Sequence, residues 1–233
     1  MRIIWDTFKD KFKYHPKPTF PSGSRVYKGF QGSGKTYSMV EYAFRIKKLC
    51  PKCVIFSNVI LKGIDYVYFN DTKGLQDALS YQNGLNGVLV LIDEAHLFFN
   101  KKDGIGIDVL TAISQQRKDL RRIVFSSQIW EELDISLRKQ VKEIVDCRCI
   151  AGYIQVNTIS DGETLTYDHL ESSYIAHKLY TEIFKHNEFL NNAYDTRQKI
   201  IKNNEFIQGQ GRGAPPALPL NITQNNKRTG RFF

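Results

Sequence analysis

The chain has 233 residues, of which 42% are hydrophobic and 24% charged, with a net charge of +9 and an isoelectric point of about 9.3. This composition excludes a disordered or fibrous chain, and the length fits one large domain with appendages. No apolar run approaches the ~20 residues of a membrane helix, and the N-terminus is too polar for a signal peptide, so we expect a cytoplasmic protein.

The first predicted elements surround a glycine-rich segment. Residues 1–23 mix basic, aromatic and proline residues and predict an arm ahead of the core. A short strand over 25–28 leads into GFQGSGKT at 29–36. The apolar spacing of 36–49 predicts a helix that ends before Pro51.

Strands and helices then alternate as far as residue 150. We expect strands over 52–57, 88–92, 122–127 and 143–150, and a hairpin within 58–69. We expect helices over 73–82, 108–120 and 134–142. The run VLVLI at 88–92 shows no polar alternation, which is typical of a parallel strand covered on both faces. The pattern predicts a doubly wound, mostly parallel α/β sheet with flanking helices.

The C-terminal third carries weaker patterns. YIQVNTI at 153–159 predicts an edge strand closed by the turn SDGE, and residues 168–205 are expected to be helical. The last stretch is rich in Gly, Pro and Asn and carries four cations and no acid, which predicts a flexible basic tail. The expected parts are an arm at 1–23, a core at 24–160, a small helical appendage of the same domain at 161–208, and a tail at 209–233.

The glycine-rich segment matches the pattern G-x-x-x-x-G-K-[ST] at Gly29, Gly34, Lys35 and Thr36. Glycines let successive backbone N–H groups turn toward a phosphate, and the helix that follows adds its positive end. The lysine supplies a cation for the β- and γ-phosphates, and the hydroxyl can ligate Mg²⁺. We expect ATP to be bound by Gly29, Gly32, Ser33, Gly34, Lys35 and Thr36.

Polar side chains follow two of the predicted strands at their carboxyl ends. Asp93 and Glu94 come directly after 88–92, and Gln128 ends the strand RIVFSSQ. Ligands gather at this edge of open α/β sheets, so Asp93 is expected to join Thr36 in holding Mg²⁺ and Glu94 to activate water. Gln128 is expected to sense the γ-phosphate or orient the water. The letters DEAH also name a helicase box, but such helicases need a second motor domain for which this chain is too short.

Four cysteines occur as two close pairs, Cys50 with Cys53 and Cys147 with Cys149. Two such pairs can complete one zinc site. The pairs border or alternate along apolar strands, however, and this favours small core residues.

The segment ISQQRKDLRRIVFSSQIWEELDISLRKQVKEIVDCR at 113–148 resembles the HerA/FtsK superfamily of DNA-pumping P-loop ATPases, which have a RecA-like (ASCE) fold. In that superfamily an arginine precedes a strand that ends in Thr/Ser-Gln, and an Asp…Arg segment follows. The chain is also similar to viral genome-packaging ATPases and to the Zot-like proteins of filamentous phages, which share GxxGSGKTY, a strand ending in Ser/Thr-Asn and IDEAH. The resemblance covers residues 25–150.

This resemblance implies a catalytic base at Glu94, a sensor at Gln128 and a trans-acting arginine finger at Arg117. Such a finger reaches the γ-phosphate of a neighbouring subunit, which implies a homo-oligomeric ring, usually a hexamer. Other arginines of the segment are rivals for the finger, although a solvated basic helix face also explains them: Arg121, Arg122 and Arg138.

The resulting hypothesis is an ATP-hydrolysing translocase of double-stranded DNA that packages a viral genome into a preformed capsid. It would work in the cytoplasm of an infected host, with a capsid or membrane-vertex protein as partner and in association with the virion. Lys101, Lys102 and the basic tail are expected to contact DNA phosphates without sequence preference. The alternatives are a Zot-like phage assembly ATPase and a slow nucleotide-dependent binding switch; Zot-like proteins usually carry a membrane span after the motor, and its absence from this sequence favours packaging.

Overall fold

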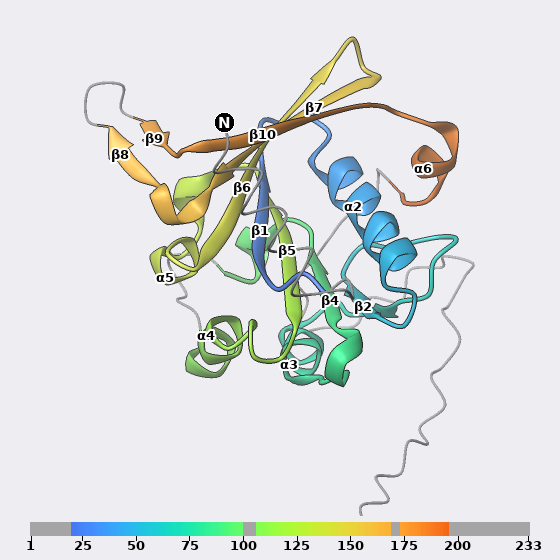
Figure 1. Cartoon of the computed structure of the whole chain (residues 1–233), viewed down its shortest axis with the longest axis vertical. Helices are drawn as coiled ribbons and strands as arrows, with labels where there is room; N and C mark the ends of the chain where they lie inside the picture. Colours follow the sequence, from blue (N-terminus) through green and yellow to red (C-terminus); the bar gives the residue numbers. More distant parts are fainter. Residues whose placement is uncertain (1–19, 100–105, 169–172, 196–233) are drawn as a thin grey trace, which may run out of the picture.

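One eight-stranded sheet runs through residues 20–99, 106–168 and 173–195, which are the residues described in this computed structural model. Its order is β10-β7-β6-β1-β5-β4-β2-β3 (Figure 1). The strands are β1 Gly23–Lys28, β2 Val54–Ser57, β3 Val67–Tyr68, β4 Val88–Ile92, β5 Arg121–Ser127, β6 Val141–Ile150, β7 Ile154–Asp161 and β10 Lys178–Lys185. The strands from β6 to β3 run parallel, whereas β7 and β10 are antiparallel additions. This confirms the predicted doubly wound, mostly parallel α/β fold.

Helices cover the two faces of the sheet (Figure 1). One face carries α2 Lys35–Leu49 and the short α6 Glu188–Asn192, and the other carries α3 Thr72–Ser80, α4 Ile107–Ser114 and α5 Ile135–Arg138. Four short 3₁₀ turns complete the order: Gly84–Asn86, Ala95–Leu97, Trp130–Glu132 and Gly162–Thr164. Strands β8 Thr166–Asp168 and β9 Ser173–Ile175 form a separate antiparallel pair. Within the described residues, every helix is too short or too polar to span a bilayer.

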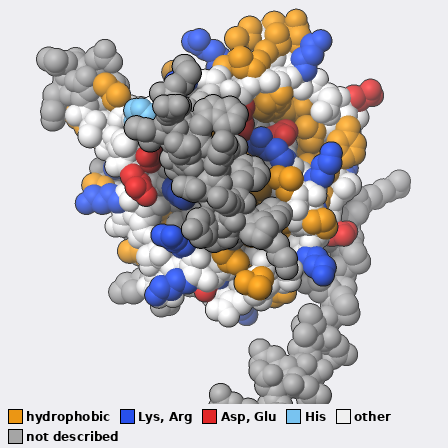
Figure 2. All heavy atoms as spheres, viewed as in Figure 1, with side chains coloured by type: hydrophobic (Ala, Val, Ile, Leu, Met, Phe, Trp, Pro, Cys, Tyr) orange, Lys and Arg blue, Asp and Glu red, His pale blue; other side chains and the backbone are white. Residues whose placement is uncertain are grey.

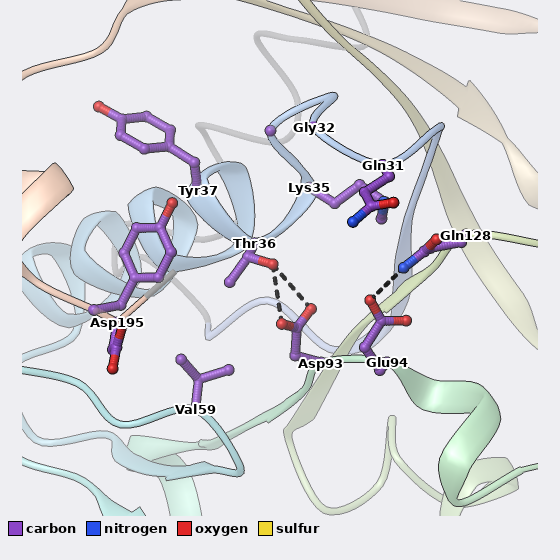
Figure 3. Close-up of a pocket in the computed structure, with 12 residues that line it drawn as sticks. Gln31, Gly32, Lys35, Thr36, Tyr37, Val59, Asp93, Glu94, Gln128 and Asp195 are labelled. Atoms are coloured by element: carbon purple, nitrogen blue, oxygen red, sulfur yellow. Dashed lines mark hydrogen bonds between the residues drawn. The ribbon is translucent and has the colours of Figure 1, made fainter. Parts of the chain in front are cut away.

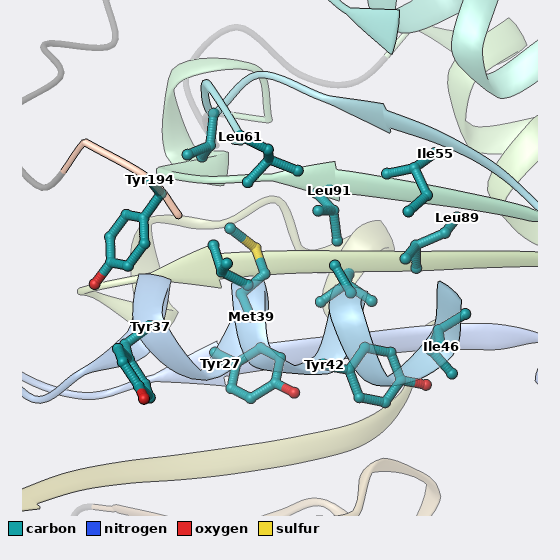
Figure 4. Close-up of a cluster of buried hydrophobic side chains, with 14 of the residues drawn as sticks. Tyr27, Tyr37, Met39, Tyr42, Ile46, Ile55, Leu61, Leu89, Leu91 and Tyr194 are labelled. Carbon is teal, nitrogen blue, oxygen red and sulfur yellow. The ribbon is translucent and has the colours of Figure 1, made fainter. Parts of the chain in front are cut away.

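The core is built by side chains that alternate between the two faces. On β4, Leu89 and Leu91 pack toward α2, whereas Val88, Val90 and Ile92 pack toward α3 and α4. All five are fully buried, and burying each side chain stabilises the fold by about 1.5–3 kcal/mol. The α2 side of this core is continuous with the first turn of the helix (Figure 4). The core therefore holds the start of α2 firmly against the sheet.

Two predicted helices are shorter in the structure, and the expected hairpin is absent from the described residues. α4 ends at Ser114 and turns then lead into β5, with Leu120 at φ 47°; α5 ends at Arg138 because the chain enters β6 at Val141. Within 58–69 the chain forms the short β3, which pairs parallel with β2, and an isolated antiparallel bridge between Leu61 and Tyr194.

The expected C-terminal helical appendage is wrong for the part of it that the structure describes. β7 is an inner strand, because β10 pairs along its outer side. The segment KLYTEIFK of β10 is rich in aromatic and β-branched residues, which favours a strand over a helix, and it pairs with β7 from Lys178 to Lys185. Among the described residues of 161–195, the helical parts are the 3₁₀ turn Gly162–Thr164 and α6. Residues 1–19 of the expected N-terminal arm, residues 100–105, residues 169–172 and the residues after 195 lie outside the described residues.

The antiparallel addition projects from the body of the molecule. Figure 2 shows hydrophobic side chains gathered at the end of the molecule where the β6–β7 hairpin projects, with lysine and arginine side chains beside them. Ile150 and Tyr153 at this tip are about half exposed, and Lys185 lies 5.8 Å from the centre of the Tyr153 ring. The addition thus has an open outer surface, while its inner side contacts α2.

Candidate nucleotide site

The carboxyl ends of β1, β4 and β5 meet at one edge of the sheet and enclose a cavity of about 400 Å³ (Figure 3). β1 leads into the glycine-rich loop, β4 into Asp93 and Glu94, and β5 into Gln128. Residues expected from the sequence that line the cavity are Gly32, Gly34, Lys35, Thr36, Asp93, Glu94 and Gln128. The fold therefore brings residues of three separate sequence segments, 32–36, 93–94 and 128, to one cavity.

The loop has the backbone shape that its glycines permit. Gly29, Gly32 and Gly34 have φ values of 147°, 77° and 82°, in the region that disfavours any side chain. The Lys35 ammonium is buried and donates to the carbonyl oxygens of Gly29 at 3.0 Å and Phe30 at 3.1 Å. Helix α2 begins at Lys35, so its positive end faces the cavity. The loop thus presents a cation and backbone donors to an anion.

Gly29 and Ser33 do not line this cavity. They border a second hollow of about 540 Å³ between the loop and strands β6 and β7. Because Gly29 and Ser33 lie outside the cavity lining, we expect them to contribute to nucleotide binding by shaping the backbone of the loop.

Thr36 and Asp93, the expected magnesium ligands, lie in direct contact. The Thr36 hydroxyl is 2.9 Å from Asp93 Oδ2 and 3.2 Å from Oδ1. Adjacent ligand oxygens of Mg²⁺, with bonds of about 2.1 Å, lie about 3.0 Å apart, so this hydroxyl–carboxylate pair fits the ion. Burial raises the pKa of Asp93 above its ordinary value, and hydrogen bonds from Ser126 and Thr36 oppose that rise. A bound cation would favour the ionised carboxylate.

Two neighbouring strands hold Asp93 in place. Asn58, directly after β2, donates from its amide to the Asp93 carbonyl at 2.9 Å and accepts from the Asp93 N–H at 2.7 Å. The Ser126 hydroxyl on β5 donates to Asp93 Oδ1 and accepts from the Glu94 N–H at 3.0 Å. Neither residue was assigned a role from the sequence, although both stand at strand ends within the motifs FSN and SSQ.

Glu94 is held in an uncommon backbone conformation. Its φ is 52°, in the left-handed region that a residue with a side chain rarely adopts. Gln128 donates from Nε2 to Glu94 Oε1 at 2.8 Å (Figure 3). His96 Nδ1 lies 3.3 Å from Oε2. Such strain persists only where surrounding contacts enforce it, and it often marks functional positions. The Glu94 carboxylate thus lines the cavity beside Gln128.

The other wall of the cavity was not anticipated from the sequence. It consists of Tyr37 from α2, Val59 after β2, and Tyr194 and Asp195 after α6. Burial raises the pKa of Tyr194 to about 12, so its hydroxyl stays protonated at neutral pH. The chain between β10 and residue 195 therefore closes one side of the site.

Candidate arginine fingers lie away from the cavity of their own chain. Arg117 is exposed in the turns before β5, at the amino end of that strand. Arg121 and Arg122 are both buried within β5, so a solvated basic helix face, the alternative to a finger role, does not explain them. Arg121 donates to Asp119 and to the Tyr81 carbonyl.

Arg122 and Arg138, the other candidate fingers, also donate hydrogen bonds within the chain. Arg122 donates to Glu143 at 2.5 Å and to the Tyr42 hydroxyl at 2.9 Å. Arg138 donates to the Tyr174 hydroxyl at 3.0 Å. Of these arginines, Arg117 is the exposed one.

The cysteines are all free thiols, and Cys53 and Cys147 are buried in the core. Among the described residues no cluster of three metal-ligating side chains occurs. Lys101, Lys102 and the basic tail, expected to contact DNA, lie outside the described residues.

Comparisons with known proteins place the fold. No family model matches the sequence, and no curated protein matches it. The N-terminal domain of zonular occludens toxin from Neisseria meningitidis has a similar structure, with a TM-score of 0.55 and 20% sequence identity over 75% of this chain and 99% of that one. The genome packaging NTPase B204 of Sulfolobus turreted icosahedral virus 2, in complex with ATP-gammaS, gives a TM-score of 0.48 and 16% identity over 67% of this chain and 97% of that one. At this identity the first likeness shows the fold, and with the loop and sheet order described above the chain has the α/β P-loop NTPase fold.

Proposed function

We propose that the chain is an ATP-hydrolysing motor that moves DNA. The observation that carries the hydrolytic part is the meeting of the phosphate loop, the Thr36–Asp93 pair and the Glu94–Gln128 pair around one cavity. A chance glycine-rich turn would not bring a carboxylate and an amide from two other strands to the same place. ATP and Mg²⁺ are the proposed ligands.

Each residue has a role that follows from its position. Backbone N–H groups of the loop bind the phosphates, and Lys35 exchanges its two carbonyl partners for phosphate oxygens. Thr36 and Asp93 would hold Mg²⁺, which when bound neutralises the charge that develops on the phosphates. Glu94 takes a proton from the attacking water, and Gln128 orients the Glu94 carboxylate through their hydrogen bond.

The test of hydrolysis is Glu94→Gln, with Glu131→Gln as the matched control. Glu131 is exposed in the 3₁₀ turn after β5 and lies outside the cavity. Glu94→Gln should lower the turnover number by about 10²–10⁴-fold while the affinity for a non-hydrolysable ATP analogue stays within about threefold. Glu131→Gln should match wild type. Turnover by Glu94→Gln at the wild-type rate would refute the base assignment and favour the alternative of a slow nucleotide-dependent switch.

Movement of double-stranded DNA during packaging of a viral genome is the finer proposal, and it rests on the sequence resemblance of 113–148. Hydrolysis should be stimulated more by duplex DNA than by single-stranded DNA, with little sequence preference and a steep decrease with salt. Preferential stimulation by single-stranded DNA would favour the Zot-like assembly role. Absence of stimulation by either would refute a DNA motor.

A ring of identical subunits is proposed together with a trans-acting Arg117. In the ring, Arg117 of one subunit would approach the cavity of its neighbour. Arg117→Ala should bind the ATP analogue normally but lose turnover, and mixing it with wild type should depress activity more than dilution does. Lys118→Ala, an exposed neighbour, is the control. Normal turnover by Arg117→Ala would refute this assignment.

A further inference from the structure

A buried amide side chain lies against the back of the phosphate loop. Gln155 on β7 is fully buried, and its Nε2 donates to the Ser33 carbonyl at 3.0 Å and to Asn157 Oδ1 at 2.9 Å. The Ser33 carbonyl can only accept, which fixes the orientation of the amide, because the reverse orientation would place its oxygen against the carbonyl oxygen. The Gln155 nitrogen therefore faces the loop.

This hydrogen bond fixes the direction of a loop donor. The peptide bonds of the described residues are trans, so the Ser33 carbonyl and the Gly34 N–H of their shared peptide point in opposite directions. Since the carbonyl is held behind the loop by Gln155, the Gly34 N–H faces the cavity that Gly34 lines. A Cβ added at Gly34 would overlap the Gln155 side chain, so the two residues are packed directly together.

The opposite end of the Gln155 amide contacts His186, which directly follows β10. Its Oε1 lies 3.2 Å from His186 Nε2, and because Oε1 can only accept, His186 carries a hydrogen on that nitrogen. The His186 ring stacks on Tyr37 with centroids 3.8 Å apart and planes 17° apart, and the Asn187 N–H donates to the Tyr37 hydroxyl at 3.0 Å. The antiparallel addition thus contacts both the loop and the first turn of α2.

We propose that Gln155 is a positioning residue of the nucleotide site and that β7 and β10 preset the phosphate loop in its anion-binding shape. This inference rests on the proposed function, because it assigns Gln155 to the same site. Gln155 does not touch the cavity; it acts through the Ser33–Gly34 peptide. Without it, the ligand itself must order the loop, and the partly buried Ser33 carbonyl loses its donor.

The expected consequence falls on binding more than on chemistry. The Gly34 N–H would contact phosphate in the ground state and in the transition state alike, so its misplacement weakens uniform binding. Gln155→Met keeps the length of the side chain and removes both of its hydrogen bonds to acceptors. We expect the Kd for a non-hydrolysable ATP analogue and the KM for ATP to rise about 10-fold, with kcat within about threefold of wild type.

Gln116→Met is the matched control. Gln116 is also a buried glutamine, and its Nε2 contacts Ser24 at 3.4 Å, at the amino end of β5 and away from the cavity. The same chemical change there should leave Kd and KM unaltered even if it lowers the melting temperature. A Kd for Gln155→Met equal to that of wild type, or a loss of kcat with unchanged Kd, would overturn the inference.

A second variant decides the question if Gln155→Met does not fold. His186→Phe keeps the stacking on Tyr37 but removes the hydrogen bond to Gln155, at a half-buried position. We expect its Kd to rise about threefold, and an unchanged Kd would overturn the inference. Wild type that binds no ATP analogue would instead refute the proposed function, so the two failures are distinguishable.

Discussion

Replacement of Glu143 by glutamine should destabilise the fold strongly, because one carboxylate oxygen serves two buried guanidinium groups. Glu143 Oε2 accepts from Arg25 Nε at 2.7 Å and from Arg122 Nη2 at 2.5 Å. The arginine side chains are 3% and 2% exposed and the glutamate is 23% exposed. Glu143→Gln would leave both cations buried without their anion.

The magnitude follows from this burial. Removing one partner of a buried ion pair destabilises a protein by about 3–5 kcal/mol. Water reaches part of Glu143, and Arg25 keeps its hydrogen bonds to the hydroxyls of Tyr27 and Tyr180, so we expect the lower end of that range, about 3 kcal/mol. For a chain of this size the loss corresponds to a decrease in melting temperature of roughly 6–12 °C.

The assay is urea unfolding at neutral pH, with Glu182→Gln as control. Glu182 pairs with Arg45, whose side chain is 38% exposed, so breaking that pair should cost at most about 1 kcal/mol. A loss for Glu143→Gln no larger than that of the control would refute the argument.

The pH dependence of the stability difference between wild type and Glu143→Gln gives a second test. Burial alone would raise the pKa of Glu143, but Arg122 and Arg25 outweigh burial and lower it. The folded state therefore favours the carboxylate, and its contribution is complete above the ordinary pKa of 4.5 and is lost as the pH falls through the lower folded pKa. The difference in the free energy of unfolding between wild type and Glu143→Gln should therefore shrink as the pH falls below 4.5. A constant difference would contradict the assignment.

Three further predictions concern the site and the core. Lys35→Ala should weaken binding of an ATP analogue by about 10–100-fold in calorimetric titration, whereas the exposed Lys48→Ala should not, and equal affinities would argue against the phosphate loop. Ser126→Ala removes a hydrogen bond to Asp93 and should lower steady-state turnover by about 10–100-fold with the melting temperature little changed; full activity would show that Asp93 needs no such support. Burial raises the pKa of Cys147 to about 12, so native protein should resist alkylation there at mildly alkaline pH, and mass spectrometric detection of rapid labelling would contradict the buried position.

The central part of the fold could be predicted because its information is local. The run at 88–92 is apolar throughout, so its burial on both faces follows from the letters alone, and Asp93 must then stand at its carboxyl end. The same reasoning places Gln128 after β5. Strand ends that carry polar residues thus identified much of the site.

Residue roles that depend on register could not be predicted. Asn58 bonds the backbone of a residue 35 positions away, and nothing in FSN says which strand will lie beside it. From the sequence, Arg121 and Arg122 were candidates for a basic surface. In the structure Arg122 on β5 forms a buried ion pair with Glu143 on β6, a contact that the sequence does not indicate. In the C-terminal third, KLYTEIFK places its apolar residues in pairs four positions apart, a spacing that a helix also shows. The strand β10 was therefore expected to be helical, and the contacts made through Gln155 were missed with it.

The hydrogen bond between Gln155 and the Ser33 carbonyl joins residues 122 positions apart, and this has a consequence for the order in which the protein is made. Translation runs from the N-terminus, so the glycine-rich segment leaves the ribosome long before β7 exists. A nascent chain that has not yet reached β7 contains Lys35 and Thr36, but it lacks the Gln155 side chain that binds the Ser33 carbonyl behind the loop. We therefore expect a nascent chain to reach the nucleotide affinity proposed above only after β7 has been synthesised and has paired beside the loop.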